Sequence, residues 1–226
     1  GKCTDMCKQQ IYVAALTKSD GSKTRYKTFT DAWSAAIENN GSSLKLLCDV
    51  DLGRTGENAA LKASSGIFTV DLNRFTLSAD SNSGVISVGN TAKLTVKNGK
   101  LTNTPTRGDS SITCAVKVFD GYVELENVEL TGGSAFGEQN CSAIVYNGTL
   151  NITDSTFNGA LMVYPDLIGK VEPKITSATL NNGIVYKYEG DSNKNYDGLK
   201  GFFADGSMFF DENGKYVDLT SDTYWS

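Results

Sequence analysis

An apolar residue recurs at a nearly constant interval through the middle of this chain, each time closing a short segment of alternating polarity. These closing residues are Leu52, Leu77, Leu101, Leu130, Phe157 and Leu180, at intervals of 25, 24, 29, 27 and 23 residues. A unit of this length cannot bury its apolar side chains alone, so neighbouring units must stack on one another to form a continuous core. The repeat therefore predicts a solenoid.

Within each unit, short segments alternate apolar and polar residues, as expected of a strand with one buried face; examples are residues 94–97 and 123–126. Asn98, Asn127 and Asp154 follow such segments, and Asn and Asp tolerate left-handed backbone geometry at turns. Gly121 and Gly148 separate these segments from a second apolar segment upstream. Each unit thus has the order strand, glycine turn, strand, Asn or Asp turn and short strand, which predicts one coil of a parallel β-helix.

The predicted register places oppositely charged residues next to each other on neighbouring coils. Residues at equal offsets from the closing apolar residue should lie about 4.8 Å apart. Lys97 then lies beside Glu126, and Lys100 lies beside Glu129. These two pairings support the alignment of the Leu101 and Leu130 units.

Several segments resemble the right-handed parallel β-helices of the pectin-lyase-like fold, and in particular the repeat regions of uncharacterised surface proteins of gut bacteria. The similar segments are residues 29–37 (FTDAWSAAI), 46–52 (LLCDVDL), 70–77 (VDLNRFTL) and 94–101 (LTVKNGKL). The resemblance covers roughly residues 25 to 185 and implies an architecture, not an activity. We therefore expect an all-β fold, a right-handed single-stranded parallel β-helix of about six coils.

One domain spanning residues 1–226 is expected, with caps that cover the exposed sheet edges of the solenoid. Residues 1–43 form the N-terminal cap, with a helix at about 31–39 whose N-cap is Thr30. Residues 44–188 form the coils. Residues 189–226 form a C-terminal hairpin or meander, because Asp205-Gly206 and Asn213-Gly214 lie between apolar segments and are strong hairpin signals.

Charge and hydropathy suggest where the protein works. The net charge of −5 and the pI near 4.8 argue against nucleic-acid binding, which requires a concentrated basic face. No apolar run is long enough to span a bilayer, and no signal peptide is present. We expect an extracellular or cell-surface protein whose export signal has been removed.

The chain contains 5 cysteines, a number that suggests disulfides with one thiol left over. Cys114 and Cys141 have the same offset from their closing residues, so they should lie side by side on adjacent coils. Either they form a disulfide or they stack as two buried thiols. Cys3, Cys7 and Cys48 could supply a second bridge at the N-terminal cap.

The absence of histidine constrains the chemistry most. It excludes Ser-His and Cys-His nucleophilic catalysis and any histidine-ligated metal centre. Asp49, Asp51 and Asp71 are weak calcium candidates, with solvated surface acids as the alternative. Glu124, Glu126 and Glu129 suggest acid–base catalysis, but Glu126 and Glu129 have predicted lysine neighbours. We therefore assign no catalytic residue, no metal and no cofactor.

Aromatic residues are concentrated in the last part of the chain, where exposed rings could stack on sugars. The binding candidates are Tyr186, Tyr188, Phe209, Tyr216 and Trp225. The alternative is that these rings fill the core beneath the C-terminal cap.

Three functional hypotheses remain. The first is an exported, non-catalytic cell-surface module for adhesion, which binds a glycan or a cell-surface protein. The second is a polysaccharide lyase or glycoside hydrolase, which only the resemblance supports. The third is a purely structural spacer. A tight acidic cluster with a nearby arginine would favour the second hypothesis, whereas an exposed row of aromatic rings would favour the first.

Overall fold

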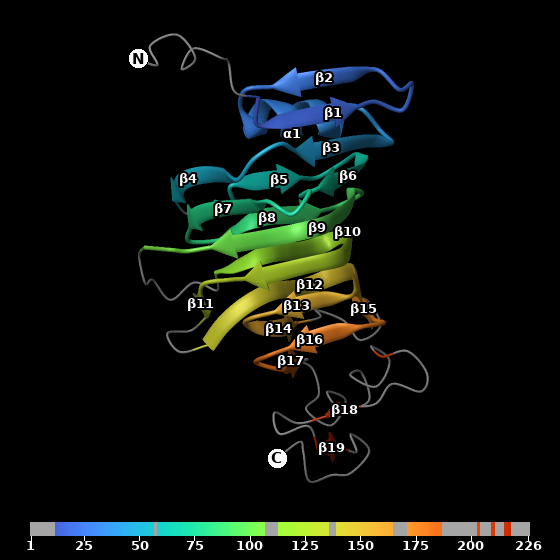
Figure 1. The fold of residues 1–226 in the computed structure, drawn as a ribbon. Helices are drawn as coiled ribbons and strands as arrows, with labels where there is room; N and C mark the ends of the chain where they lie inside the picture. The colour runs from blue at the N-terminus through green and yellow to red at the C-terminus, as the bar shows by residue number, and fades with distance from the viewer. Residues whose placement is uncertain are drawn as a thin grey trace, which may run out of the picture.

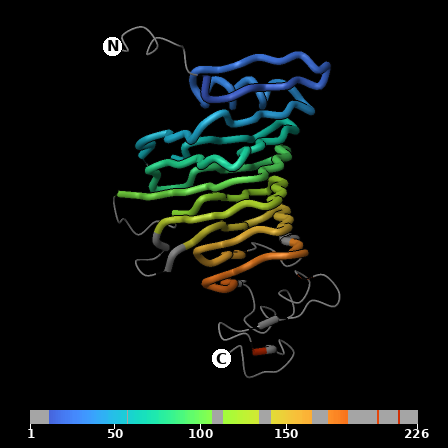
Figure 2. The backbone as a smooth tube through the Cα atoms, in the orientation of Figure 1, coloured from blue at the N-terminus to red at the C-terminus, as the bar shows by residue number. Residues whose placement is uncertain are grey.

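The chain winds into a parallel β-solenoid of about five turns, with its earliest strands at one end of the stack (Figures 1 and 2). The structure is a computed structural model, and it describes residues 12–56, 58–106, 113–135, 139–164 and 171–186, together with 203, 209–210 and 215–217. The fold class expected from the repeat is confirmed.

Each turn has three strand segments, and equivalent segments stack into three faces. The first face contains β3 (Ser42–Leu46), β6 (Ile67–Asp71), the start of β9 (Lys93–Asn103), the middle of β10 (Cys114–Thr131), the second half of β12 (Gln139–Thr153) and β15 (Val171–Ile175). Six segments thus stack on this face, and about five turns join them. The six expected coils correspond to these six stacked segments.

The other two faces are built in the same way. The second face contains β4 (Val50–Gly56), β7 (Thr76–Ser81), the ends of β9 and β10, β13 (Ser155–Phe157) and β16 (Ala178–Leu180). The third face contains β5 (Leu61–Ala63), β8 (Gly84–Gly89), the starts of β10 and β12, β14 (Ala160–Val163) and β17 (Ile184–Tyr186). The long strands β10 and β12 therefore each continue from one face to another.

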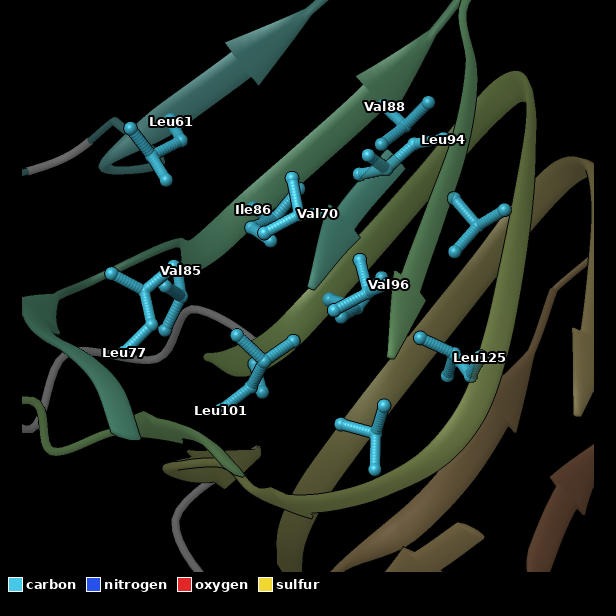
Figure 3. Close-up of a cluster of buried hydrophobic side chains, with 14 of the residues drawn as sticks. Leu61, Val70, Leu77, Val85, Ile86, Val88, Leu94, Val96, Leu101 and Leu125 are labelled. Carbon is cyan, nitrogen blue, oxygen red and sulfur yellow. The ribbon is translucent and has the colours of Figure 1, made fainter. Parts of the chain in front are cut away.

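The interior of the coils is a single apolar core to which all three faces contribute (Figure 3). Val70, Leu94 and Leu125 come from the first face, while Ile86 comes from the third, and all four are almost fully buried. Burying a side chain of this size contributes roughly 1.5–3 kcal/mol. The stacked aliphatic side chains are therefore the main source of stability.

The closing residues stack as predicted from Leu77 onward. Leu77 lies opposite Leu101, Leu101 opposite Leu130, Leu130 opposite Phe157, and Phe157 opposite Leu180. The charged pairs confirm this register, because Glu126 lies opposite Lys97 and the Lys100 Nζ lies 2.6 Å from the Glu129 Oε2.

The prediction for the first closing residue is wrong, since Val50, and not Leu52, lies opposite Leu77. Val50 is 7% exposed, whereas Leu52 is only partly buried. A shift of two residues preserves the alternation of a strand, so the polarity pattern alone did not distinguish the two.

The expected turn column is present on the first face. Asn98, Asn127 and Asp154 have φ values of 59°, 55° and 49°. The amide of Asn127 donates to the side-chain oxygen of Asn98, and the Asn98 amide donates to Asp71. All three residues therefore adopt the left-handed backbone geometry. The side-chain hydrogen bonds of Asn98 and Asn127 also connect adjacent coils.

The N-terminal cap consists of a helix and two antiparallel strands. α1 (Phe29–Glu38) begins two residues earlier than the expected 31–39, and its N-cap is Thr28 instead of Thr30. The Thr28 hydroxyl accepts from the Asp31 amide, and buried Phe29 packs beside Trp33, so both residues fix the earlier start. β1 (Ala14–Thr17) pairs antiparallel with β3 and with β2 (Lys23–Tyr26), which forms the exposed, basic outer strand.

Two short hairpins accompany the solenoid. β18 (Phe209–Phe210) and β19 (Tyr216–Val217) pair antiparallel, which confirms the hairpin expected around Asn213-Gly214. The hairpin expected around Asp205-Gly206 lies outside the described residues. β11 (Ser134–Ala135) pairs antiparallel with the start of β12.

Candidate aromatic binding site

Three aromatic side chains on consecutive coils stack along the outside of the third face. We call Phe119, Tyr146 and Tyr164 the aromatic ladder. The ring centroids of Phe119 and Tyr146 lie 4.5 Å apart with an interplanar angle of 9°, and those of Tyr146 and Tyr164 lie 6.3 Å apart with an angle of 37°. The Phe119 and Tyr146 rings are thus parallel, at about the coil-to-coil spacing of 4.8 Å.

The backbone places these rings at the corner between the third and first faces. Each ring follows a buried valine that points into the core: Val118, Val145 and Val163. The pairing of β10 with β12 shifts by one residue after Val118, so that Phe119 lies opposite Asn147 and Gly121 opposite Gly148. Because side chains alternate along a strand, the residue after each inward-pointing valine projects outward, and in β10 the register shift follows directly.

On the other side of Phe119, the residue opposite it on the neighbouring coil is a glycine, which has no side chain. Both Phe119 and Asp120 lie opposite Gly89. A Cβ placed on Gly89 would lie 3.1 Å from the Phe119 carbonyl oxygen and 3.9 Å from the Phe119 Cβ, with no ring atom closer. Phe119 is 41% exposed, which is unusual for a phenylalanine. One face of its ring rests on Tyr146, and no side chain of residue 89 covers the other.

A small apolar cluster supports the two tyrosines from behind. It contains Cys114, Cys141, Ile144, Ala160 and Met162, with Tyr146 and Tyr164 packed against it. Burial raises the pKa of the Tyr146 hydroxyl, and the nearby thiols of Cys114 and Cys141 raise it further. Burial likewise raises the pKa of Tyr164. Both hydroxyls therefore stay protonated, and the half-buried tyrosines form a firm base for the exposed Phe119.

The cysteine pair lies where the repeat placed it, within this cluster. Cys114 and Cys141 are both fully buried and are free thiols in the structure. The pKa of the Cys141 thiol is raised, mainly by a hydrogen bond with Cys114 and also by burial. Cys48 is also a free thiol, whereas Cys3 and Cys7 lie outside the described residues. The disulfide between Cys114 and Cys141 stays a prediction.

Around the corner from the ladder, the first face presents a polar surface. The Lys93 Nζ lies 6.0 Å from the Tyr122 ring centroid, and the Asn151 amide donates to the Tyr122 hydroxyl at 2.8 Å. Glu124 accepts from the Thr95 hydroxyl at 3.3 Å. The Asn151 Oδ1 is buried without a partner. A 180° flip of this amide would let Oδ1 accept from the Tyr122 hydroxyl, so the orphaned atom does not by itself indicate a ligand.

The three calcium candidates have separate structural roles. Asp49 accepts from the Thr76 amide, Asp51 from the Gly53 amide, and Asp71 from the amide of Asn73. Across the described part of the chain, no group of three or more His, Cys, Asp or Glu side chains could hold a metal ion. Asp51 and Asp71 therefore hold local turns in this structure, whereas Asp49 links two adjacent coils.

The carboxylates considered for acid–base chemistry lie among basic and polar partners. A hydrogen bond from Lys100 lowers the pKa of Glu129, and a hydrogen bond from Asn158 lowers it further. Glu126 lies opposite Lys97. A lowered pKa keeps Glu129 ionised, which is the reverse of what a general acid requires.

The aromatic candidates chosen from the sequence are placed only in part. Tyr186 ends β17, where its backbone lies opposite Val163. Phe209 lies opposite Val217, and Tyr216 lies opposite Phe210. Tyr188 and Trp225 lie outside the described residues. The sequence reasoning did not find the aromatic ladder, although the dipeptides Val118-Phe119, Val145-Tyr146 and Val163-Tyr164 were an available signal.

By fold, the protein is a parallel β-solenoid with an N-terminal capping helix, and its most distinctive described surface is the aromatic ladder. Comparisons with protein-family models, curated proteins and solved structures found no match to this chain. In the part that the structure describes, no helix has the length and apolar character needed to cross a membrane.

Proposed function

We propose that this chain is an exported, non-catalytic surface module that binds carbohydrate at the aromatic ladder. The observation that supports this function best is the exposed Phe119 ring, held parallel to Tyr146 at a centroid distance of 4.5 Å. The face of an aromatic ring is electron-rich, and it attracts the polarised C–H groups on the flat side of a sugar ring. An exposed, pre-ordered ring is therefore a suitable platform for a sugar.

Charge favours a sugar over the other common ligands that stack on aromatic rings. Single-stranded nucleic acids also stack on exposed rings, but they require a positively charged groove along the phosphate backbone. The net charge of this chain is −5. The resemblance to pectin-lyase-like β-helices, and in particular to surface proteins of gut bacteria, supports an extracellular location.

The test is a titration of the protein with a panel of neutral and acidic glycans, in which calorimetry or NMR measures the binding. We expect Phe119→Ala to weaken binding about tenfold, since loss of one good aromatic contact costs roughly 1.4 kcal/mol. Tyr12→Ala is the matched control, because Tyr12 is another exposed aromatic residue, 37% exposed, outside the ladder. It should leave binding unchanged.

Two results would contradict this function. A flat response across the whole panel would leave adhesion to a protein or a purely structural role. Release of unsaturated or reducing ends from a polysaccharide would instead establish the lyase or hydrolase alternative.

A further inference from the structure

Phe119 is the most exposed of the three rings, and it lies at the end of the aromatic ladder that faces the coil of Gly89. Tyr146 lies between Phe119 on one side and Tyr164 on the other. The outer face of Phe119 borders the coil of Gly89, which has no side chain to cover it. Phe119 and Tyr146 overlap face to face, and the Tyr164 ring is tilted by 37° to that of Tyr146, so the three rings do not form a flat row on which several sugars could lie side by side.

Neighbouring coils are separated by about 4.8 Å, so a ring at the level of Gly89 would lie about this far from Phe119. That distance suits a single flat ring, since the Phe119 and Tyr146 centroids are separated by 4.5 Å. A bound ring would occupy the position that an aromatic side chain at residue 89 would otherwise fill. Gly89 is therefore the residue that keeps the site open.

Two exposed polar residues, Asp120 and Asn90, adjoin Phe119 and Gly89 along the chain, and an exposed acid favours a neutral ligand over an anionic one. Asp120 is exposed and lies opposite Gly89, as Phe119 does. Its carboxylate is an acceptor for sugar hydroxyls and repels an anionic sugar. Asn90 is exposed directly after Gly89, and its backbone amide donates to the Phe119 carbonyl at 3.1 Å, which ties the two coils together at the site.

We infer that the ladder binds one neutral pyranose ring, stacked on Phe119 beside Gly89 with a hydroxyl bound to Asp120. This inference rests on the proposed function and specifies its ligand: one terminal or isolated sugar unit, and not a run of several units along a polysaccharide. Because only one ring is contacted, affinity does not grow with the length of the glycan.

The first experiment compares the dissociation constants of a monosaccharide, a disaccharide and a hexasaccharide of the same neutral sugar with the wild-type protein. We expect values that agree within about threefold, and no measurable binding of the matching uronic acid. A hexasaccharide bound at least tenfold more tightly than the monosaccharide, with Phe119→Ala still harmful, would overturn the single-ring inference and leave the proposed function standing. Tighter binding of the uronic acid would overturn the assignment of a neutral ligand.

The second experiment fills the open space. Gly89→Leu adds a side chain next to the exposed face of Phe119, and we expect at least a tenfold loss of affinity. Thr91→Leu is the matched control, since it places the same side chain at an exposed position two residues along the chain and should leave binding intact. Far-UV circular dichroism verifies the fold of each variant, and the length series decides the question if Gly89→Leu does not fold. Unchanged binding by a folded Gly89→Leu variant would contradict the inference. An absence of glycan binding by the wild type would defeat the proposed function as well.

Discussion

Replacing Gly148 by alanine should destabilise the solenoid strongly, because two coils approach each other closely at this turn beside the ladder. Gly148 has a φ of +100°, and a Cβ there would lie 2.9 Å from the Gly121 nitrogen and closer still to the Gly121 carbonyl oxygen. Ordinary van der Waals contacts of a Cβ begin at 3.4 Å. The two backbones would therefore have to separate by roughly 1 Å, which breaks the spacing of the hydrogen-bonded coils.

The expected loss of stability has two parts. A left-handed backbone costs a residue with a side chain roughly 1–2 kcal/mol. Overpacking in a well-packed region adds about 1–3 kcal/mol. The total is about 2–5 kcal/mol, which corresponds to a shift of the urea midpoint of about 1–2 M for a slope of roughly 2–3 kcal/mol/M.

Gly21→Ala is the matched control for the steric part of this effect. Gly21 also has a positive φ, +83°, but no atom lies within 4 Å of the position that a Cβ would take there. The backbone penalty is partly offset by the lower entropy of the unfolded alanine chain, about 0.4–1 kcal/mol, so the net cost should be only about 1 kcal/mol. Urea unfolding followed by far-UV circular dichroism and by tryptophan fluorescence measures both variants. Equal midpoint shifts would refute the argument that coil contact at Gly148 determines the larger effect.

Three further predictions concern the cap, an ion pair and the buried thiols. Thr28→Ala should cost about 0.5–2 kcal/mol in thermal or urea unfolding because it removes the N-cap, whereas Thr30→Ala should cost little; the opposite order would restore the cap expected from the sequence. Glu129→Gln should lower stability by no more than about 1 kcal/mol above pH 5, since the pair with lysine is partly exposed. The folded-state pKa of Glu129 lies below its ordinary value of 4.5, so the difference in stability between the wild type and this variant should shrink as the pH falls through and below 4.5. A difference in stability that persists in acid would contradict the ion-pair origin. Peptide mapping after thiol labelling should find Cys114 and Cys141 unmodified in the native protein and labelled after unfolding, whereas a linked peptide pair would establish the disulfide.

The sequence predicted the register correctly where two neighbouring coils have equivalent segments. Leu101 and Leu130 stack as predicted because both close equivalent segments, and the charged pair of Lys100 and Glu129 lies at the same offset. The first coil lacks such a neighbour, since antiparallel β1 covers β3 there. Val50 and Leu52 lie two residues apart in one alternating run, so only the backbone pairing distinguished them.

The candidate site was not readable in the same way. The aromatic residues of the ladder are 27 and 18 residues apart, so they do not follow one fixed interval. Their alignment follows the pairing of Val118 with Val145 and of Val145 with Val163, and the connections between these coils differ in length. A concentration of aromatic residues near the C-terminus was the stronger signal in the sequence, although it says nothing about which rings are exposed or stacked.

The β-solenoid itself followed from the order of residues alone, because alternation and repetition specify which side of each strand is buried and how often the chain returns to it. The open platform at Phe119 became visible only once the coils were stacked. The exposure of that ring depends on Tyr146 below it and Gly89 above it, and these residues lie on neighbouring coils. Burial of a strand face is a local property of the chain, whereas access to a side chain depends on what the adjacent coil places next to it.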